Sequence, residues 1–138
     1  MNERKKELVL AWLAKAMSDL ETARLLIQRE KRLLDIAAYH CQQSAEKALK
    51  AWLTSQDIVF PKTHELEELL GLCLPTGPGF EQLRQACEEL TPLAQEFRYP
   101  GDVAEPTVEE AQRALGLAEH VYTFCERLST KAVYWAKR

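Results

Sequence analysis

Residues 35–53 read DIAAYHCQQSAEKALKAWL, and their hydrophobic period sets the expectation for the whole chain. Small and apolar residues recur every three to four positions, so they share one face of a helix. That face carries Ala38, Cys41, Ala45, Ala48, Leu49 and Trp52. The opposite face is polar and includes Glu46 and Lys50, four residues apart in the order that stabilises a helix. The stretch therefore predicts an amphipathic helix with Asp35 as its N-cap, whose alanines let a neighbouring helix approach closely.

The same period of 3.6 residues continues on both sides of this helix. The other helices are predicted from residue 3 to 29, from the Thr63 cap to Pro75, from residue 80 to Tyr99, and from the Thr107 cap to Leu128. Pro92 is expected to kink or restart the fourth of the five helices, with Thr91 as a new cap. Thr107 and Glu110 have the spacing of a capping box.

No segment has the pattern of a β-strand, and short connections place consecutive helices antiparallel. The predicted fold is therefore all-α, an antiparallel up-and-down bundle of four main helices plus a short fifth helix. Residues 1–128 are expected to form this single domain, and residues 129–138 a C-terminal tail.

Length and composition fit one ordinary globular domain. The chain has 138 residues, of which 46% are hydrophobic and 28% charged, so it can build a core without disulfide or metal support. No apolar run approaches 18 residues, and the N-terminus lacks the apolar centre of a signal peptide. A net charge of −3 also lacks the basic footprint of a dedicated nucleic-acid binder. We therefore expect a cytoplasmic protein without a membrane partner.

The cysteine and histidine positions do not predict a metal site. Cys41, Cys73, Cys87 and Cys125 are far apart in the sequence, and the three histidines are isolated. Zinc sites usually pair their ligands within two to five residues. We expect the cysteines to be small buried residues in a reducing compartment, and we expect no cofactor.

Four short motifs occur in order along the chain. They are Ala16-Met-Ser-Asp-Leu20, Gln42-Gln-Ser-Ala-Glu-Lys-Ala-Leu-Lys-Ala51, Lys62-Thr-His-Glu-Leu66 and Arg98-Tyr-Pro100. Together they resemble the HEPN family, named for higher eukaryotes and prokaryotes nucleotide-binding domains, over about residues 8–128. The resemblance implies a bundle that forms a homodimer and works with a separately encoded minimal nucleotidyltransferase. In some branches of the family this pair is a toxin–antitoxin module.

Other branches of the family are metal-independent ribonucleases, which carry an arginine followed after four to six residues by a histidine. Arg98 takes the arginine position here, but no histidine lies between Val103 and Glu105. The usual general acid or base near pH 7 is therefore missing. Arg113 and His120 have a similar spacing, but they lie within one predicted helix and we interpret them as a coincidence.

Six residues are candidates for binding a nucleotide or an acidic surface: Gln43, Lys47, Lys50, Lys62, His64 and Arg98. Each also has a purely structural interpretation. The α-helical face that carries the two central lysines could simply be solvated, His64 could pack beside the Thr63 cap, and Arg98 could satisfy a helix C-terminus. Asp19 stands on an otherwise apolar face and needs a partner. The expected structural pairing joins Asp19 or Glu46 to Arg98, with Lys47 as an alternative partner of Asp19.

The sequence is consistent with two functions. The first is a non-catalytic subunit that binds a nucleotide, a substrate or its nucleotidyltransferase partner. The alternative is a ribonuclease toxin with a degenerate Arg…His motif around Arg98. We favour the first, because the motif lacks its histidine.

Overall fold

The computed structural model describes residues 1–95 and 105–135. This part of the chain contains five α-helices, three short 3₁₀ segments and no β-strand. The helices are α1 (Glu3–Gln28), α2 (Leu34–Ser55), α3 (Leu66–Cys73), α4 (Arg84–Leu90) and α5 (Val108–Trp135). The predicted all-α fold class is confirmed.

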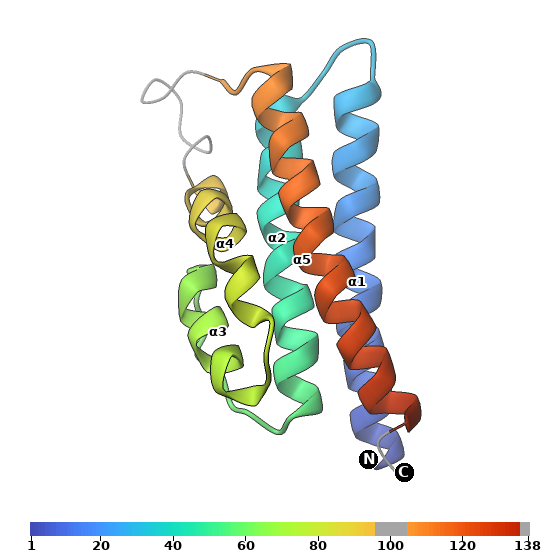
Figure 1. The fold of residues 1–138 in the computed structure, drawn as a ribbon. Helices are drawn as coiled ribbons and strands as arrows, with labels where there is room; N and C mark the ends of the chain where they lie inside the picture. The colour runs from blue at the N-terminus through green and yellow to red at the C-terminus, as the bar shows by residue number, and fades with distance from the viewer. Residues whose placement is uncertain (96–104, 136–138) are drawn as a thin grey trace.

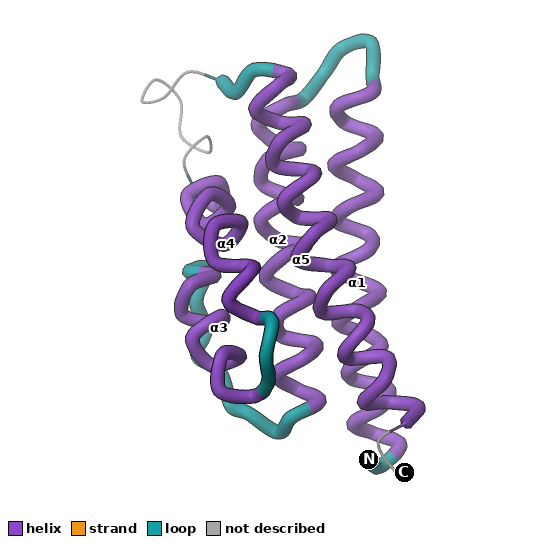
Figure 2. The backbone as a smooth tube through the Cα atoms, viewed as in Figure 1, coloured by secondary structure: helices purple, strands orange, loops and turns teal. Residues whose placement is uncertain are grey.

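The three long helices α1, α2 and α5 lie side by side, with α3 and α4 against one side of them (Figures 1 and 2). Following the chain colours, α1 and α2 run in opposite directions, and α4 runs opposite to α5. Helix α2 packs against all four other helices. It is the centre of the bundle, and 14 of its 22 residues are buried.

The fourth predicted helix is broken in the described residues into a 3₁₀ segment (Phe80–Leu83), the seven-residue α4, and another 3₁₀ segment (Thr91–Ala94). Its predicted end at Tyr99 lies outside the described residues. Pro92 is the cause, because it cannot donate the backbone hydrogen bond that would continue α4. Thr91 does act as a cap, but for a different helix: its hydroxyl accepts the backbone N–H of Leu66, at the start of α3.

Further helix ends differ from the sequence predictions. Helix α3 begins at Leu66 with Glu65 at its N-cap, so Thr63 does not cap the helix, and its hydroxyl accepts from the backbone N–H of Glu65 in the preceding loop. Helix α2 begins at Leu34, so Asp35 lies inside its first turn, and its carboxylate accepts from the backbone N–H of Ile36. Helix α5 continues to Trp135, past residue 128 where the tail was expected to begin. The extension is stabilised because Val133 is buried in a small cluster with Val9 and Leu13 of α1.

The start of α5 is confirmed as a capping box. The backbone N–H of Glu110 donates to the Thr107 hydroxyl at 3.0 Å, and the Glu110 carboxylate accepts from the backbone N–H of Thr107 at 2.8 Å. This reciprocal pair satisfies two donors that the first turn would otherwise leave unpaired. It holds α5 in place at the end of the bundle where α2 also begins (Figure 1).

All four cysteines are buried and free, as the sequence predicts. Burial raises the pKa of the Cys41, Cys73 and Cys87 thiols to about 12. A thiol that stays protonated is a poor nucleophile, so these groups serve packing. None of the helices in the described ranges is long and apolar enough to cross a membrane.

Candidate functional site

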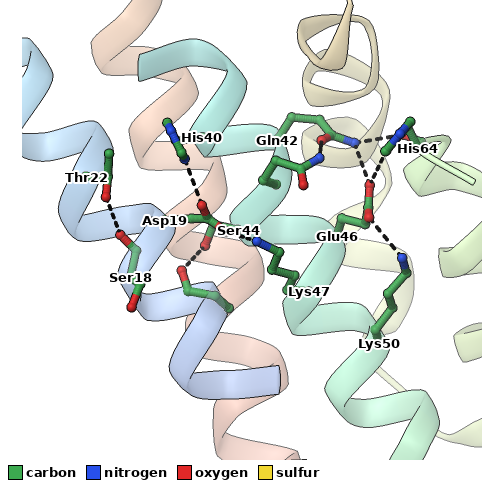
Figure 3. A network of polar contacts seen from close by, with 12 residues as sticks. Ser18, Asp19, Thr22, His40, Gln42, Ser44, Glu46, Lys47, Lys50 and His64 are labelled. Carbon is green, nitrogen blue, oxygen red and sulfur yellow. Dashed lines mark hydrogen bonds and ion pairs between the residues drawn. The ribbon is translucent and has the colours of Figure 1, made fainter. Parts of the chain in front are cut away.

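Helix α2 carries an unusual number of buried polar side chains for a central helix. Gln42, Gln43, Ser44 and Glu46 are consecutive or nearly so, and each is at most 9% exposed. Burying a polar group costs free energy unless the group is hydrogen-bonded. These side chains and their partners on α1 and in the α2–α3 loop form the network in Figure 3, which we take as the candidate site.

The polar contacts of this network fall into two groups. The first, here called the Asp19 cluster, consists of Asp19, His40 and Lys47. The carboxylate belongs to α1 and is 7% exposed. It accepts a hydrogen bond from Lys47 Nζ at 2.7 Å and contacts His40 Nδ1 at 2.8 Å, and both of these residues belong to α2 (Figure 3). Asp19 therefore satisfies its need for a partner across the α1–α2 contact, with Lys47 in the position of its counter-ion.

The second group, here called the Glu46 cluster, consists of Glu46, Lys50 and His64. Glu46 is 4% exposed and accepts from Lys50 Nζ at 2.9 Å, one turn along α2. His64 lies in the loop before α3, and its Nδ1 is 2.8 Å from the Glu46 carboxylate (Figure 3). Burial opposes ionisation of Glu46, but the hydrogen bonds from His64 and Lys50 outweigh it and lower the carboxyl pKa.

Two glutamines extend the Glu46 cluster along α2. The side-chain amide of Gln42 donates to the backbone carbonyl of His64 at 2.8 Å, which fixes the loop at that point. The amide of Gln43 donates to the Gln42 oxygen at 2.7 Å. A chain of hydrogen bonds thus runs from Gln43 to the loop that carries His64.

Aromatic rings enclose the lysine of the Glu46 cluster. Lys50 Nζ lies 5.6 Å from the ring centroids of both Trp12 and Phe60. The two rings meet edge to face, with centroids 6.3 Å apart. Cation–π attraction of this kind adds to the ion pair and holds the ammonium group in place. Trp12 therefore packs on a charged group of the network.

The charges of the network balance. Lys47 pairs with Asp19, and Lys50 pairs with Glu46. A phosphate approaching either lysine would have to compete with a buried carboxylate less than 3 Å away. The network therefore offers hydrogen-bonding groups more readily than free positive charge.

Three of the predicted site residues, Gln43, Lys50 and His64, belong to the Glu46 cluster with its two glutamines, and Lys47 belongs to the Asp19 cluster. Lys62 is exposed in the adjoining loop and makes no ion pair within residues 1–95 and 105–135. Arg98 lies outside the described residues, so its pairing with Asp19 or Glu46 and its ligand-binding role stay predictions. Three members of the network, His40, Gln42 and Ser44, were not among the predicted site residues. His40 lies three residues before Gln43 and seven before Lys47, which places all three on one helix face.

The spaced pair Arg113 and His120 takes no part in the network. Two guanidinium nitrogens of Arg113, Nε and Nη2, donate to the two carboxylate oxygens of Glu89 at 2.7 Å each, and this pair joins α5 to α4. This bidentate pair accounts for the arginine structurally. Within the described ranges, no group of three His, Cys, Asp or Glu side chains is arranged to hold a metal ion.

Comparison with known proteins gives a family match and two related structures. The model of the HEPN domain matches residues 9–128. One is the crystal structure of ST0689, an archaeal HEPN homologue, whose sequence is 24% identical to that of this chain. The two structures align with a TM-score of 0.70 over 88% of this chain and 97% of ST0689. TT1696 from Thermus thermophilus is 27% identical with a TM-score of 0.71, over 86% and 96% of the two chains. No curated protein matches the sequence significantly.

Proposed function

The chain belongs to the HEPN domain family, and from this premise we propose that it is a non-catalytic subunit that binds a nucleotide or substrate. In this proposal it acts with a separately encoded minimal nucleotidyltransferase. The subunit presents the ligand, and the partner enzyme supplies the catalytic groups.

The observation that carries the proposal is the buried network on α2. Buried ion pairs are poor stabilisers compared with apolar side chains of similar size. A bundle of this size has enough apolar surface to fold without them, as its core of leucines and alanines indicates. The buried Glu46 carboxylate, with a lysine and an exposed histidine, is therefore better explained by a polar site than by stability.

His64 is the member of the network best placed to meet a ligand. Its side chain is 55% exposed, whereas the carboxylate behind it is 6% exposed. Glu46 and Gln42 hold the ring and its backbone carbonyl from behind. An exposed group that is held rigidly binds a ligand at a smaller entropic cost than a mobile one.

Co-purification tests the partnership directly. The chain is co-expressed with the product of a neighbouring gene that carries a Gly-Ser motif and paired aspartates, and only one of the two proteins is tagged. The proposal expects a stable complex, and calorimetry on that complex should detect nucleotide binding. Two proteins that elute separately, together with a chain that binds no nucleotide, would overturn it.

The proposal extends to assembly and cellular role. We propose a homodimer, cytoplasmic in location, and a place for the pair within a toxin–antitoxin module. Light scattering of the purified chain measures the assembly, with about twice the monomer mass expected. Growth of cells expressing the chain alone, then with its partner, tests the module: toxicity that the partner relieves supports it, and normal growth in both contradicts it.

A metal-independent ribonuclease is the second candidate, and one observation favours it. His64 and His40 each have Nδ1 held by a buried carboxylate, an arrangement that orients an imidazole for proton transfer. These rings would replace the histidine that the motif around Arg98 lacks. RNA cleavage by the pure chain, lost in both Arg98→Ala and His64→Ala, would favour this candidate over the non-catalytic one.

A further inference from the structure

Helix α1 packs against α2 and α5 and lies at the edge of the bundle (Figure 1). Its outer face, here called the α1 seam, is exposed from its first turn to its last third. The residues of the seam recur at alternating intervals of three and four, which keeps them in one line along the helix. They are Arg4, Glu7, Ala11, Ala14, Ser18 and Glu21.

The shape of the seam suits a second helix. Leu8 is 50% exposed on one side of it and Leu10 is 36% exposed on the other. Between the two leucines the seam carries only small side chains, which let another helix approach closely. A shallow groove of about 300 Å³ is lined, among the described residues, by Arg4, Glu7, Leu8 and Ala11. Residues at these spacings form the hole that receives a side chain of the facing helix in a coiled coil.

The charged side chains of the seam are unpaired in the single chain. The neighbouring Lys5 and Lys6 each form an ion pair. Arg4, Glu7 and Glu21 form none within residues 1–95 and 105–135. Charges without a partner on their own chain are available to a surface of complementary sign. The seam offers both signs, with an arginine at one end and a glutamate at the other.

The order of residues along the seam is complementary to itself. Three pairs lie symmetrically about a midpoint between residues 12 and 13: Arg4 with Glu21, Glu7 with Ser18, and Ala11 with Ala14. Two copies of α1 laid antiparallel about that midpoint therefore place Arg4 opposite Glu21 of the partner subunit, and two-fold symmetry repeats the contact. A parallel arrangement would set each charge against its own copy. A second, antiparallel copy of this chain is therefore the occupant that the seam fits.

We propose that the α1 seam is the contact surface of a homodimer in which the two copies of α1 pack antiparallel. The alanines meet at the two-fold axis, an ion pair closes each end, and Glu7 faces the hydroxyl of Ser18 of the partner subunit, which can donate to a carboxylate. The contact runs over residues 4–21, about 27 Å at 1.5 Å per residue. The inference rests on the proposed function, since it names the surface through which the proposed homodimer forms.

Charge reversal tests the register on the purified full chain. Sedimentation over a series of concentrations measures the dissociation constant of the dimer, and circular dichroism checks that each variant is folded. Arg4→Glu sets two carboxylates against each other at both ends of the contact, and Glu21→Arg sets two arginines against each other. We expect each single variant to raise the dissociation constant at least about tenfold, because symmetry repeats the repulsion. Lys31→Glu, the same reversal at an exposed position off the seam, is the matched control and should dimerise like the wild type.

Mixing the two single variants tests the pairing directly. One copy then carries an acid at both positions and the other an arginine at both, so the two end contacts become attractive again. The mixture should form a heterodimer with about the wild-type affinity, and a mixture that stays monomeric would overturn the inference. A wild-type dimer that neither variant weakens would also overturn it, while leaving the proposed homodimer intact. A wild-type chain that is monomeric throughout would overturn both, and calorimetry tests nucleotide binding separately from either result.

Discussion

The Asp19 cluster and the Glu46 cluster use the same three groups in different ways. Each has a buried carboxylate, a lysine and a histidine bound through Nδ1. In the Asp19 cluster the acid comes from α1 and both partners from α2, so the cluster joins two long helices. In the Glu46 cluster the acid and the lysine are one turn apart on α2, and only the histidine comes from a loop.

The exposure of the two histidines also differs between the Asp19 cluster and the Glu46 cluster. The His40 side chain is 27% exposed, whereas that of His64 is 55% exposed. We infer that the Asp19 cluster mainly fixes how α1 and α2 pack, and that the Glu46 cluster mainly holds an imidazole at the surface. In this inference, the same three groups take a structural role or a binding role according to which elements supply them.

The largest expected effect tests the structural half of this comparison. Asp19→Ala leaves Lys47 without its counter-ion between two helices, so we expect a loss of about 3 kcal/mol in the free energy of unfolding, measured with urea. The double variant Asp19→Ala with Lys47→Met removes both charges and should recover much of that loss. A single variant as stable as the wild type would mean that the cluster does not fix the helix packing.

Replacing each histidine with alanine tests the difference between the two clusters more finely. His40→Ala removes a hydrogen bond to a buried carboxylate at a half-buried position and should cost about 1.5 kcal/mol of stability. His64→Ala acts at a more exposed position and should cost less than about 0.5 kcal/mol. Thermal unfolding of the two variants under one buffer condition measures the difference. The reverse order would assign the structural role to the wrong cluster.

Acid titration probes the Glu46 cluster by itself. Its carboxyl pKa is lowered in the folded chain, so its contribution to stability is complete above the unfolded value of about 4.3. That contribution is lost as the pH falls through the lower, folded pKa. The gap in unfolding free energy between the wild type and Glu46→Gln should therefore close on acidification from pH 7. A gap that is constant throughout the titration would contradict the ion pairing.

The smallest effect is expected far from both clusters. Arg113 pairs with Glu89 on the surface, where solvent screens the charges. Arg113→Ala should unfold at the same urea concentration as the wild type, within error. A clear loss of stability would show that charge pairs in this chain matter regardless of burial, and the contrast between the two clusters would lose its basis.

Much of the fold is readable from the sequence because local rules govern it. The period of apolar residues locates α1, α2 and α5, and the Thr107–Glu110 spacing gives the start of α5. The errors arise where contacts from elsewhere in the chain prevail. Thr91 caps α3 instead of a restarted helix, and packing of Val133 against α1 extends α5 beyond residue 128.

The sequence predicted part of the membership of the candidate site and part of its pairing. Gln43, Lys47, Lys50 and His64 stand out as a polar face and a motif. The Glu46–Lys50 pair follows from their spacing on one helix, and Lys47 was one of the two partners predicted for Asp19. That His64 also meets Glu46 depends on where the α2–α3 loop returns, which the spacing of residues within one helix does not show. His40 escaped notice for the same reason, because its partner Asp19 is 21 residues away.

The most direct test of the account compares the two histidines in ligand binding. Calorimetry of adenosine 5′-monophosphate is carried out on the wild type, His64→Ala and His40→Ala, at a temperature where circular dichroism shows all three to be folded. The account predicts that His64→Ala weakens binding by about tenfold or more, whereas His40→Ala retains the wild-type affinity. Unchanged binding in His64→Ala, or an equal loss in both variants, would contradict it.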